Sequence, residues 1–334
     1  MMWPERIENT PYEKHNEVRG INMGLFSKPE VVILKDSCDS KEYLAKLEEL
    51  RSTVPDSSVV AEKIDKEIAV TEAGIFGEDG VLFELKNSGM NLVVIRDLYI
   101  ITSDGRSAQI DFYVITPYAD VIIECKNLFG NIEINSKGDF IRSFDYKGRK
   151  YKEGIYSPIT QNERHLQVYK DCWESNKGFM TKLIGGKYFT DYHKTIVVLA
   201  NSKTVVNDKY AKKEIKQQVI RADQLINYLK NLKTDVKSGL KSMCESGERI
   251  LSMNVQERTD YFKKFEDLAA EVKAVSVTTE APKEAAPLVK TEGNLVCPRC
   301  GGQLILRTAK KGDNAGNQFY GCSNFPKCRY VQNI

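Results

Sequence analysis

Asp111, Glu124 and Lys126 are the residues whose types and spacing could do chemistry. Side chains alternate between the two faces of a strand, so Glu124 and Lys126 point the same way. If the strands that carry Asp111 and Glu124 pair through a turn at Pro117-Tyr118, Asp111 reaches that face as well. Two carboxylates can hold a divalent cation, and a lysine beside them can position a water for attack on phosphorus. The pattern therefore predicts the centre of a metal-dependent nuclease.

A plainer interpretation of the same residues has to be weighed against this one. An isolated Glu-x-Lys on a strand is usually a solvated face, and an isolated Asp often caps a turn. Here Glu124 directly follows the apolar run Val121-Ile122-Ile123, which favours emergence from a buried core. Asp111 lies inside a second apolar segment, where an unpaired carboxylate would be costly. These contexts favour the functional interpretation.

Four cysteines near the C-terminus form the strongest single motif. Cys297 and Cys300 enclose two residues, a gap of 21 residues follows, and Cys322 and Cys328 form the second pair. Two such pairs can close a tetrahedral thiolate site for structural Zn²⁺. A module of about forty residues cannot build a sufficient core, so the metal must supply folding energy. The other cysteines are scattered, as ordinary reduced thiols are: Cys38, Cys125, Cys172 and Cys244.

The overall composition excludes a few classes of protein. Lys+Arg number 49 against 46 Asp+Glu in 334 residues, so any basic surface must be local. No apolar run approaches the roughly 20 residues of a membrane helix. The first residues have no signal-peptide core, so we expect a cytoplasmic protein without membrane association.

Alternating strand and helix patterns predict an α/β fold. The long strand signals are Leu92–Thr102, Ala108–Thr116, Asp120–Lys126 and His193–Ala200, with shorter hairpin strands at Gly130–Asn135, Asp139–Tyr146 and Arg149–Tyr151. The helical signals are Ser40–Leu50, Val59–Leu85, Ser157 to about Trp173, Arg221–Leu232 and Met253–Ala270. The candidate catalytic residues fall at the ends of this predicted sheet.

Several motifs together resemble a known family. They are Gly77-Glu78, Gln109-Ile110-Asp111, Ile123-Glu124-Cys125-Lys126-Asn127 with Gly130, and Ser157-Pro158-Ile159-Thr160-Gln161-Asn162. Over about residues 73–175 the chain resembles the nuclease-related (NERD) domain of the PD-(D/E)XK restriction-endonuclease-like superfamily. The resemblance implies a mixed sheet flanked by helices.

The resemblance also implies roles for single residues. Asp111 and Glu124 would ligate Mg²⁺ or Mn²⁺, with the Cys125 carbonyl completing the inner shell. Lys126 would orient the attacking water and steady charge on the phosphate. Glu78 would hold a second metal or support the first, and Gln161 would project from the next helix. Some relatives carry Gln-x-x-x-Tyr there, where this chain has His165; it can approach the site or bond locally, and the local role is favoured.

The cysteine segment resembles the C-terminal zinc fingers of type IA DNA topoisomerases. The match includes Cys297-Pro-x-Cys300-Gly301 and Phe319-Tyr320-Gly321-Cys322-Ser323-Asn324-Phe325-Pro326-x-Cys328. Six basic side chains face one acidic side chain here, and four aromatic residues are interleaved with them. Basic groups can track phosphates while aromatic rings stack on unpaired bases. We therefore expect a zinc ribbon that binds DNA, in single-stranded form among others, with RNA as an alternative.

We expect six segments along the chain. They are a disordered leader (1–22), a helical N-terminal region (23–72), a nuclease-like domain (73–200), a helical extension (201–270), a flexible linker (271–294) and the zinc ribbon (295–334). The expected function is a metal-dependent DNA nuclease in DNA processing, repair or defence against foreign DNA. The alternative is an inactive adaptor that keeps the fold and binds nucleic acid. The sequence leaves the oligomeric state open.

Overall fold

The computed structural model describes residues 28–175, 188–256, 258, 260–279, 297–308, 318–324 and 327–333. The chain divides into two compact units, Met1–Val277 and Thr278–Ile334. The predicted leader (1–22) and most of the predicted linker (271–294) lie outside the described residues.

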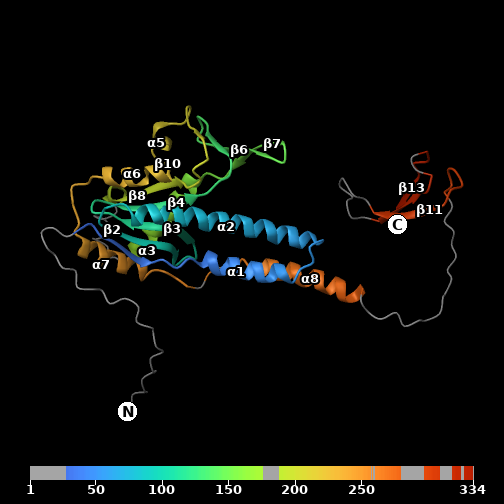
Figure 1. Cartoon of the computed structure of the whole chain (residues 1–334), viewed down its shortest axis with the longest axis horizontal. Coiled ribbons are helices and arrows are strands. Elements are labelled where there is room, and N and C mark those ends of the chain that lie inside the picture. Colours follow the sequence, from blue (N-terminus) through green and yellow to red (C-terminus); the bar gives the residue numbers. More distant parts are fainter. Residues whose placement is uncertain are drawn as a thin grey trace, which may run out of the picture. The chain divides into compact units, whose positions relative to one another are not determined.

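A six-stranded mixed sheet forms the centre of the first unit, in the order β1-β2-β3-β4-β8-β10 (Figure 1). Its strands are β1 (Val31–Lys35), β2 (Leu92–Ile101), β3 (Ser107–Ile115), β4 (Asp120–Lys126), β8 (His193–Leu199) and β10 (Val219–Arg221). β2, β3 and β4 are antiparallel, whereas β1, β8 and β10 each run parallel to their neighbour. The inner strands are buried on both faces because they consist almost wholly of apolar residues.

Helices cover both faces of this sheet. On one face, α2 (Val59–Lys86) and α6 (Leu225–Asn231), which follows the short helix η1 (Ala222–Gln224), pack against the sheet. On the other face, α3 (Pro158–Ser175) and α7 (Leu240–Leu251) do so. The Ser58 hydroxyl caps α2 by accepting a hydrogen bond from the backbone N–H of Val60 at 3.0 Å. The predicted α/β class, with a mixed sheet flanked by helices, is confirmed.

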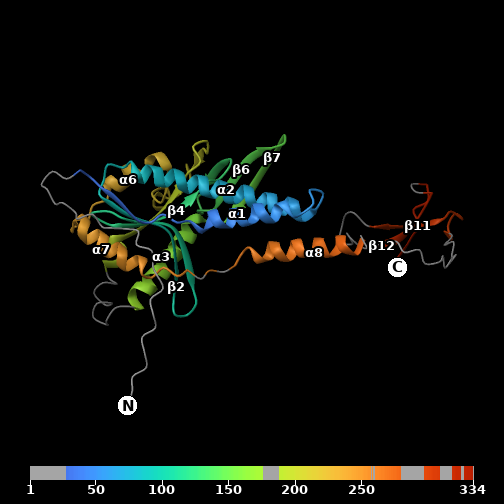
Figure 2. The same cartoon turned by 60° about the horizontal axis from the view of Figure 1, so that its bottom comes forward.

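A smaller helical cluster joins α1 (Asp39–Ser52), the first half of α2 and α8 (Lys263–Thr279). Figure 2 shows α1 alongside α2. The α8 helix begins later than the predicted Met253 and continues past the predicted linker start at residue 271. The predicted extension (201–270) is not helical throughout, since β10 joins the main sheet and α7 packs on it. Both β1 and α7 were missed from the sequence.

A second sheet, in the order β7-β6-β5-β9, follows directly from the end of β4. It comprises β5 (Asn131–Ile134), β6 (Phe140–Tyr146), β7 (Arg149–Ile155) and β9 (Val206–Asn207), with the short helix α5 (Lys213–Lys216) nearby. At the tip of the β6–β7 hairpin, Lys147 and Gly148 both have positive φ, as a two-residue type I′ turn requires. The hairpin extends away from the main sheet in both views (Figures 1 and 2).

The second unit is a three-stranded antiparallel ribbon of β11 (Leu304–Thr308), β12 (Gln318–Cys322) and β13 (Val331–Asn333). Its small core consists of three cysteines and Leu304, with Tyr320 and Tyr330 partly buried against them. The predicted zinc-ribbon architecture is confirmed. Among the described helices of the whole chain, none is both long and apolar enough to cross a bilayer.

Candidate functional site

The β3–β4 hairpin brings the two predicted acids to one place. Its register pairs Phe112 with Ile123 and Ile115 with Asp120, which places Asp111 opposite Glu124 at the next position. The strands are joined by the turn expected at Pro117-Tyr118, closed by a hydrogen bond from the Thr116 N–H to the Ala119 carbonyl at 3.0 Å. The pairing on which the sequence argument depended therefore exists.

Four of the five predicted catalytic side chains form hydrogen bonds or an ion pair within the β3–β4 hairpin or with the start of α3. The backbone N–H of Cys125 donates to Asp111 Oδ2 at 2.7 Å. Lys126 Nζ lies 2.6 Å from Glu124 Oε1 and donates to Gln161 Oε1 at 3.2 Å. Gln161 comes from the first turns of α3, on the face of the sheet to which Glu124 and Lys126 point. A compact group of two acids, an amine and an amide results.

Burial makes both carboxylates unusually easy to protonate. Only 2% of the Glu124 side chain is exposed, and burial raises its pKa against the opposing charge of Lys126. Burial, and then the charge of Glu124, raise the pKa of Asp111 well above its ordinary value. Such carboxylates are expensive to keep ionised without a positive charge between them.

Lys126 keeps its charge in this setting. Burial works against the ammonium form, but the neighbouring Glu124 carboxylate outweighs it and raises the pKa of Lys126. The amine is therefore a cationic hydrogen-bond donor at neutral pH.

Glu78 is bound by other partners than the predicted ones. Its Oε2 accepts hydrogen bonds from Arg96 Nε at 3.2 Å and Nη2 at 3.0 Å, and from the Cys38 thiol at 3.5 Å. Its charge still contributes to the raised pKa values of Asp111 and Glu124, so it lies near the two acids. To ligate a metal, Glu78 would have to leave Arg96.

Arg96 was missed from the sequence. It is 1% exposed in the middle of β2, where it also donates to Asp79 Oδ1 at 2.7 Å. A single arginine inside the apolar run Leu92–Ile101 was the available signal, since a buried charge needs a partner.

His165 approaches the site rather than bonding locally, contrary to the favoured expectation. Its Nδ1 lies 3.4 Å from Glu124 Oε2, and neither atom has a hydrogen-bond partner within the described part of the chain. Burial, and then the charge of Lys126, lower the pKa of His165 to about 4. The imidazole is therefore neutral at physiological pH.

The donor set fits a hard divalent cation. Glu124 Oε2 is buried without a hydrogen bond from any described residue, and a buried carboxylate oxygen normally has a partner. The carboxylates of Asp111 and Glu124 offer oxygen ligands of the type that Mg²⁺ and Mn²⁺ prefer. The residues present therefore fit the metal that the resemblance implies.

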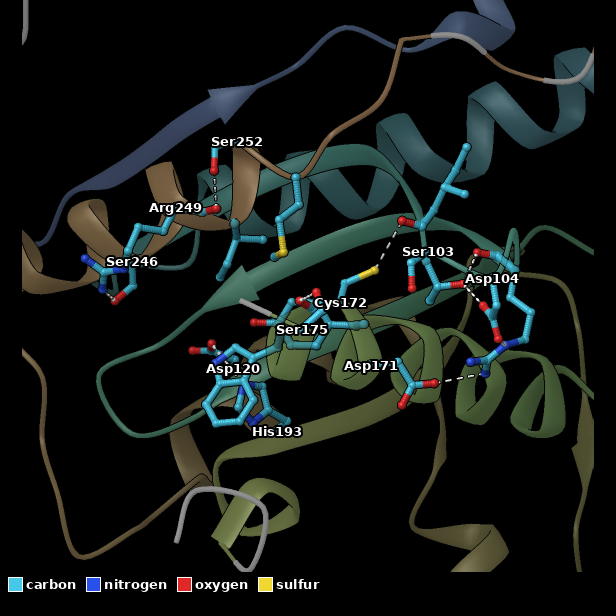
Figure 3. Close-up of a pocket in the computed structure, with 17 residues that line it drawn as sticks. Ser103, Asp104, Asp120, Asp171, Cys172, Ser175, His193, Ser246, Arg249 and Ser252 are labelled. Atoms are coloured by element: carbon cyan, nitrogen blue, oxygen red, sulfur yellow. Dashed lines mark hydrogen bonds and ion pairs between the residues drawn. The ribbon is translucent and has the colours of Figure 1, made fainter. Parts of the chain in front are cut away.

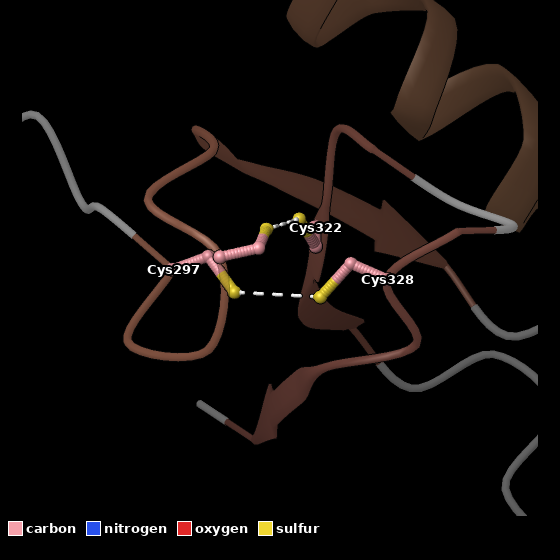
Figure 4. Close-up of side chains that lie close together, drawn as sticks. Cys297, Cys322 and Cys328 are labelled. Atoms are coloured by element: carbon pink, nitrogen blue, oxygen red, sulfur yellow. Dashed lines mark hydrogen bonds between the residues drawn. The ribbon is translucent and has the colours of Figure 1, made fainter.

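The ribbon cysteines form a second, different metal site. Each offers one sulfur, and the four Sγ atoms of Cys297, Cys300, Cys322 and Cys328 lie within 4.8 Å of one another (Figure 4). Cys297 Sγ is 3.8 Å from Cys328 Sγ, and Cys300 Sγ is 3.3 Å from Cys322 Sγ. Sulfurs about 2.3 Å from a tetrahedral Zn²⁺ are about 3.8 Å apart. The cluster supports structural zinc.

A cavity lies on the face of the first unit's sheet that α3 and α7 cover. It measures about 780 Å³ and is lined by residues of β2, α3 and α7 and by Asp120 at the start of β4 (Figure 3). Asp120 accepts a hydrogen bond from the Tyr113 hydroxyl at 2.8 Å and lies 3.7 Å from His193 Nε2. None of the predicted catalytic residues lines this cavity. The predicted catalytic residues of the β3–β4 hairpin therefore lie outside this cavity.

The fold and the two sites define an α/β unit with a buried acid–acid–lysine centre, followed by a ribbon with four cysteine ligands. Residues 73–200 match the profile of the family described as nuclease-related domain (NERD). Residues 295–334 match the profile described as topoisomerase DNA binding C4 zinc finger. Both resemblances are confirmed, and the two matches together point to nucleic acid as the class of ligand.

Similarity to individual curated proteins covers only short segments. DNA topoisomerase 1 of Methanocaldococcus jannaschii is 46% identical over 43 residues, which is 13% of this chain and 5% of the relative. DNA topoisomerase 1 of Mycoplasma genitalium is 33% identical over 93 residues, 28% of this chain and 11% of the relative. Uncharacterized protein YrdD of Escherichia coli is 40% identical over 45 residues, 14% of this chain and 22% of the relative. No solved structure matches the chain.

Proposed function

We propose that this protein is a Mg²⁺- or Mn²⁺-dependent nuclease that hydrolyses phosphodiester bonds in DNA. The observation that carries the proposal is the position of Asp111 opposite Glu124, with Lys126 bonded to Glu124 beside them. Two buried carboxylates with raised pKa values lie on central strands of the sheet. If they had no function, such groups would only lower the stability of the fold. A role in binding a cation would account for them.

Each side chain has a defined task in this proposal. Asp111 and Glu124 hold the divalent ion, which when bound neutralises phosphate oxygens and lowers the pKa of a water. Lys126, charged and held by Gln161, donates hydrogen bonds to the phosphate where negative charge develops. In the reaction, a water oxygen bonds to phosphorus and gives up one proton to solvent, the bond from phosphorus to the leaving oxygen breaks, and that oxygen takes up one proton from solvent.

The zinc ribbon is proposed to bind the same DNA. The family to which it is similar is described as DNA binding. Arg299, Arg307, Lys327 and Arg329 surround the cysteines in the sequence and suit phosphate contacts. With four cysteine ligands the zinc has no open position, so its task is to fold the module.

One observation favours a second candidate, a non-catalytic adaptor that binds nucleic acid. Glu124 already pairs with Lys126, and Glu78 with Arg96, so part of the acidic charge is neutralised by the protein itself. An inactive relative of a nuclease could keep such pairs for stability.

Cleavage of plasmid and single-stranded DNA by the zinc-loaded full chain, with added Mg²⁺, added Mn²⁺ or neither, separates the two candidates. Lys126→Met and Asp111→Asn should each lower the cleavage rate by about 100-fold or more. Lys86→Met is the matched control, because Lys86, the last residue of α2, makes an exposed ion pair with Asp36, which follows β1. DNA binding without metal-dependent cutting, unchanged by Lys126→Met, would favour the adaptor.

A further inference from the structure

We infer that the β6–β7 hairpin, together with Phe129 and Tyr156, forms a platform that stacks the bases of a single-stranded nucleic acid beside the carboxylate site. The inference rests on the proposed function and narrows its substrate to strands with an unpaired segment at the site. Ring contacts join Phe129, Phe144 and Tyr151, and Tyr146 and Tyr156 are exposed rings at the two ends of the same chain segment. The five residues are named here the aromatic platform.

Aromatic rings line one face of the hairpin. Phe144 of β6 pairs directly with Tyr151 of β7, so the two side chains share a face. Their rings stack with centroids 5.2 Å apart and an interplanar angle of 14°. Phe129 meets Phe144 edge-on at 5.9 Å and keeps 60% of its surface exposed. Rings left this exposed are not needed for the apolar core below, which uses Ile132, Ile134 and Phe140.

Basic side chains accompany these rings. The Arg142 guanidinium lies 4.8 Å from the centre of the Phe144 ring, and Lys147 Nζ lies 5.2 Å from that of Tyr146. From Tyr146 to Lys152 the sequence contains four basic residues and no acidic one. Three of them make no ion pair with any described residue, namely Lys147, Arg149 and Lys150. Asp145 lies opposite Lys150 across the hairpin, so three unpaired cations face one such acid and the hairpin presents net positive charge.

The platform starts at the catalytic site. Phe129 is three residues after Lys126, so their Cα atoms are at most about 11 Å apart. Gly130 has a φ of +97°, and a Cβ there would lie 2.5 Å from the Ser143 carbonyl oxygen. This close approach lets the loop carry Phe129 against Phe144, and only glycine permits it.

A second ring lies on the other chain segment that enters the site. Tyr156 is 57% exposed and precedes α3. The guanidinium of Arg164, which neighbours His165 on α3, lies 5.5 Å from the centre of the Tyr156 ring. Aromatic–cationic pairs thus occur on the segment leaving β4 and on the segment leading to Gln161.

The chemistry of the platform selects among nucleic acids. In a duplex the bases are stacked inside, and a protein surface reaches mainly phosphates and groove edges. Unpaired bases expose their faces, on which aromatic side chains stack while cations follow the backbone. A surface for duplex phosphates would need the lysines and arginines alone. The combination of exposed rings and unneutralised cations fits a single strand.

Fluorescence anisotropy with the zinc-loaded full chain in buffer without added Mg²⁺ or Mn²⁺, where no metal-dependent cutting occurs, tests the inference. The probes are a labelled single strand, the matching duplex and an abasic single strand of the same length. The variant Phe129→Ala/Tyr151→Ala should weaken binding of the single strand about tenfold or more. It should change binding of the duplex and of the abasic strand less than about twofold, because neither offers free base faces. Tyr261→Ala, which removes a ring 64% exposed elsewhere in the same unit, should change none of the three.

The outcomes separate this inference from the proposed function. Equal losses on all three probes would overturn it and indicate phosphate contacts only, and unchanged binding of the single strand would overturn it as well. If the platform variant loses single-strand binding but the unaltered chain never cuts DNA, the platform stands and the nuclease proposal fails. Thermal unfolding of the variant, compared with Tyr261→Ala, checks that the hairpin change leaves the unit folded.

Discussion

The cysteine cluster of the ribbon and the acid–acid–lysine centre of the first unit are built in opposite ways. In the ribbon, each ligand pair is local in sequence, and the sulfurs themselves make up most of a small core. In the first unit, Asp111, Glu124 and Gln161 come from β3, β4 and α3, and two large apolar clusters on the faces of the sheet hold them. We therefore expect the ribbon to depend on its metal for folding, whereas apolar packing of the sheet holds the acids in position.

The pKa shifts of the ribbon cysteines and of the two acids also have different causes. Backbone N–H donation from Gly302, together with hydrogen bonds from neighbouring thiols, lowers the pKa of Cys300 to about 6. Against backbone N–H donation from Asn324, burial and the neighbouring thiols raise the pKa of Cys322 to about 12, so the four sulfurs share protons unequally. Burial raises the pKa of both Asp111 and Glu124, which disfavours their ionised forms unless a positive charge lies close. Perturbing each site should therefore affect different properties of the chain.

Breaking the zinc site should give the largest effect. Cys322→Ser removes one of four ligands, and zinc binding contributes about 10 kcal/mol or more to the folding of such modules. We expect zinc content measured by mass spectrometry to fall from one ion per chain to near zero. The thermal unfolding of the first unit should stay unchanged, because its core contains no cysteine of the ribbon.

Cys244→Ser is the matched control for this change. Cys244 is half-buried against the main sheet and takes no part in the cluster of four. Loss of zinc from this variant, or full zinc content in Cys322→Ser, would contradict the assignment of the ligands.

Gly77 on α2 tests whether close packing in the first unit positions the acid–acid–lysine centre. A Cβ on Gly77 would lie 2.6 Å from Asn127 Cβ and 3.3 Å from Ala200 Cβ. Gly77→Ala should therefore push α2 from the sheet next to Lys126, lower the free energy of unfolding by about 1–3 kcal/mol and reduce cleavage.

The same helix supplies the control for Gly77→Ala. Gly80→Ala meets nothing within 4 Å and should stabilise α2 by up to about 1 kcal/mol, with cleavage unchanged. Urea denaturation and a cleavage assay measure both variants. Similar behaviour of the two would mean that close packing of α2 does not position the site.

Asp120 gives an effect on stability that is confined to one range of pH. Burial raises its pKa from 3.8 to about 6, so the folded chain binds a proton more tightly than the unfolded chain. Its contribution to stability is present below pH 4 and is lost as the pH rises to about 6. Since 22% of the side chain is exposed, we expect a loss of about 2 kcal/mol.

Asp120→Asn should remove this loss. Relative to the unaltered chain, the variant should gain about 2 kcal/mol in the free energy of unfolding between pH 4 and pH 6, measured by urea denaturation. His193, with a pKa lowered to about 4 mainly by burial, contributes the opposite slope in both proteins and cancels in the comparison. Parallel pH profiles would show that Asp120 does not titrate in this range.

Much of the first unit could be predicted because its signals are local. The β4 strand occurs over Asp120–Lys126 as expected, since a buried strand is a continuous apolar run between turn residues. The α7 helix was missed although Leu240–Leu251 carries a local signal, since Leu240, Met243, Cys244, Ile250 and Leu251 recur at helix spacing. Met243 and Ile250 are buried on the side that faces the sheet.

The site residues likewise divide into those that local sequence patterns indicate and those that depend on the assembled fold. Asp111, Glu124 and Lys126 could be proposed from strand alternation and one hairpin turn, and their predicted convergence exists in the structure. Arg96 as the partner of Glu78 was not proposed, and the approach of His165 to the site was only the less favoured alternative. Both contacts join elements whose separation in space no local pattern specifies.

The sequence alone was enough to specify the zinc ligands, the alternation of strands and helices and the acid–acid–lysine hairpin. Each of these depends on residues that are near neighbours along the chain or in one hairpin. The assembled fold was needed to establish that Glu78 pairs with Arg96, that His165 reaches Glu124 and that exposed rings gather beside Lys126. The physical reason is that burial and packing between distant segments set the partners and protonation of buried charges, and these arise only when the sheet has formed.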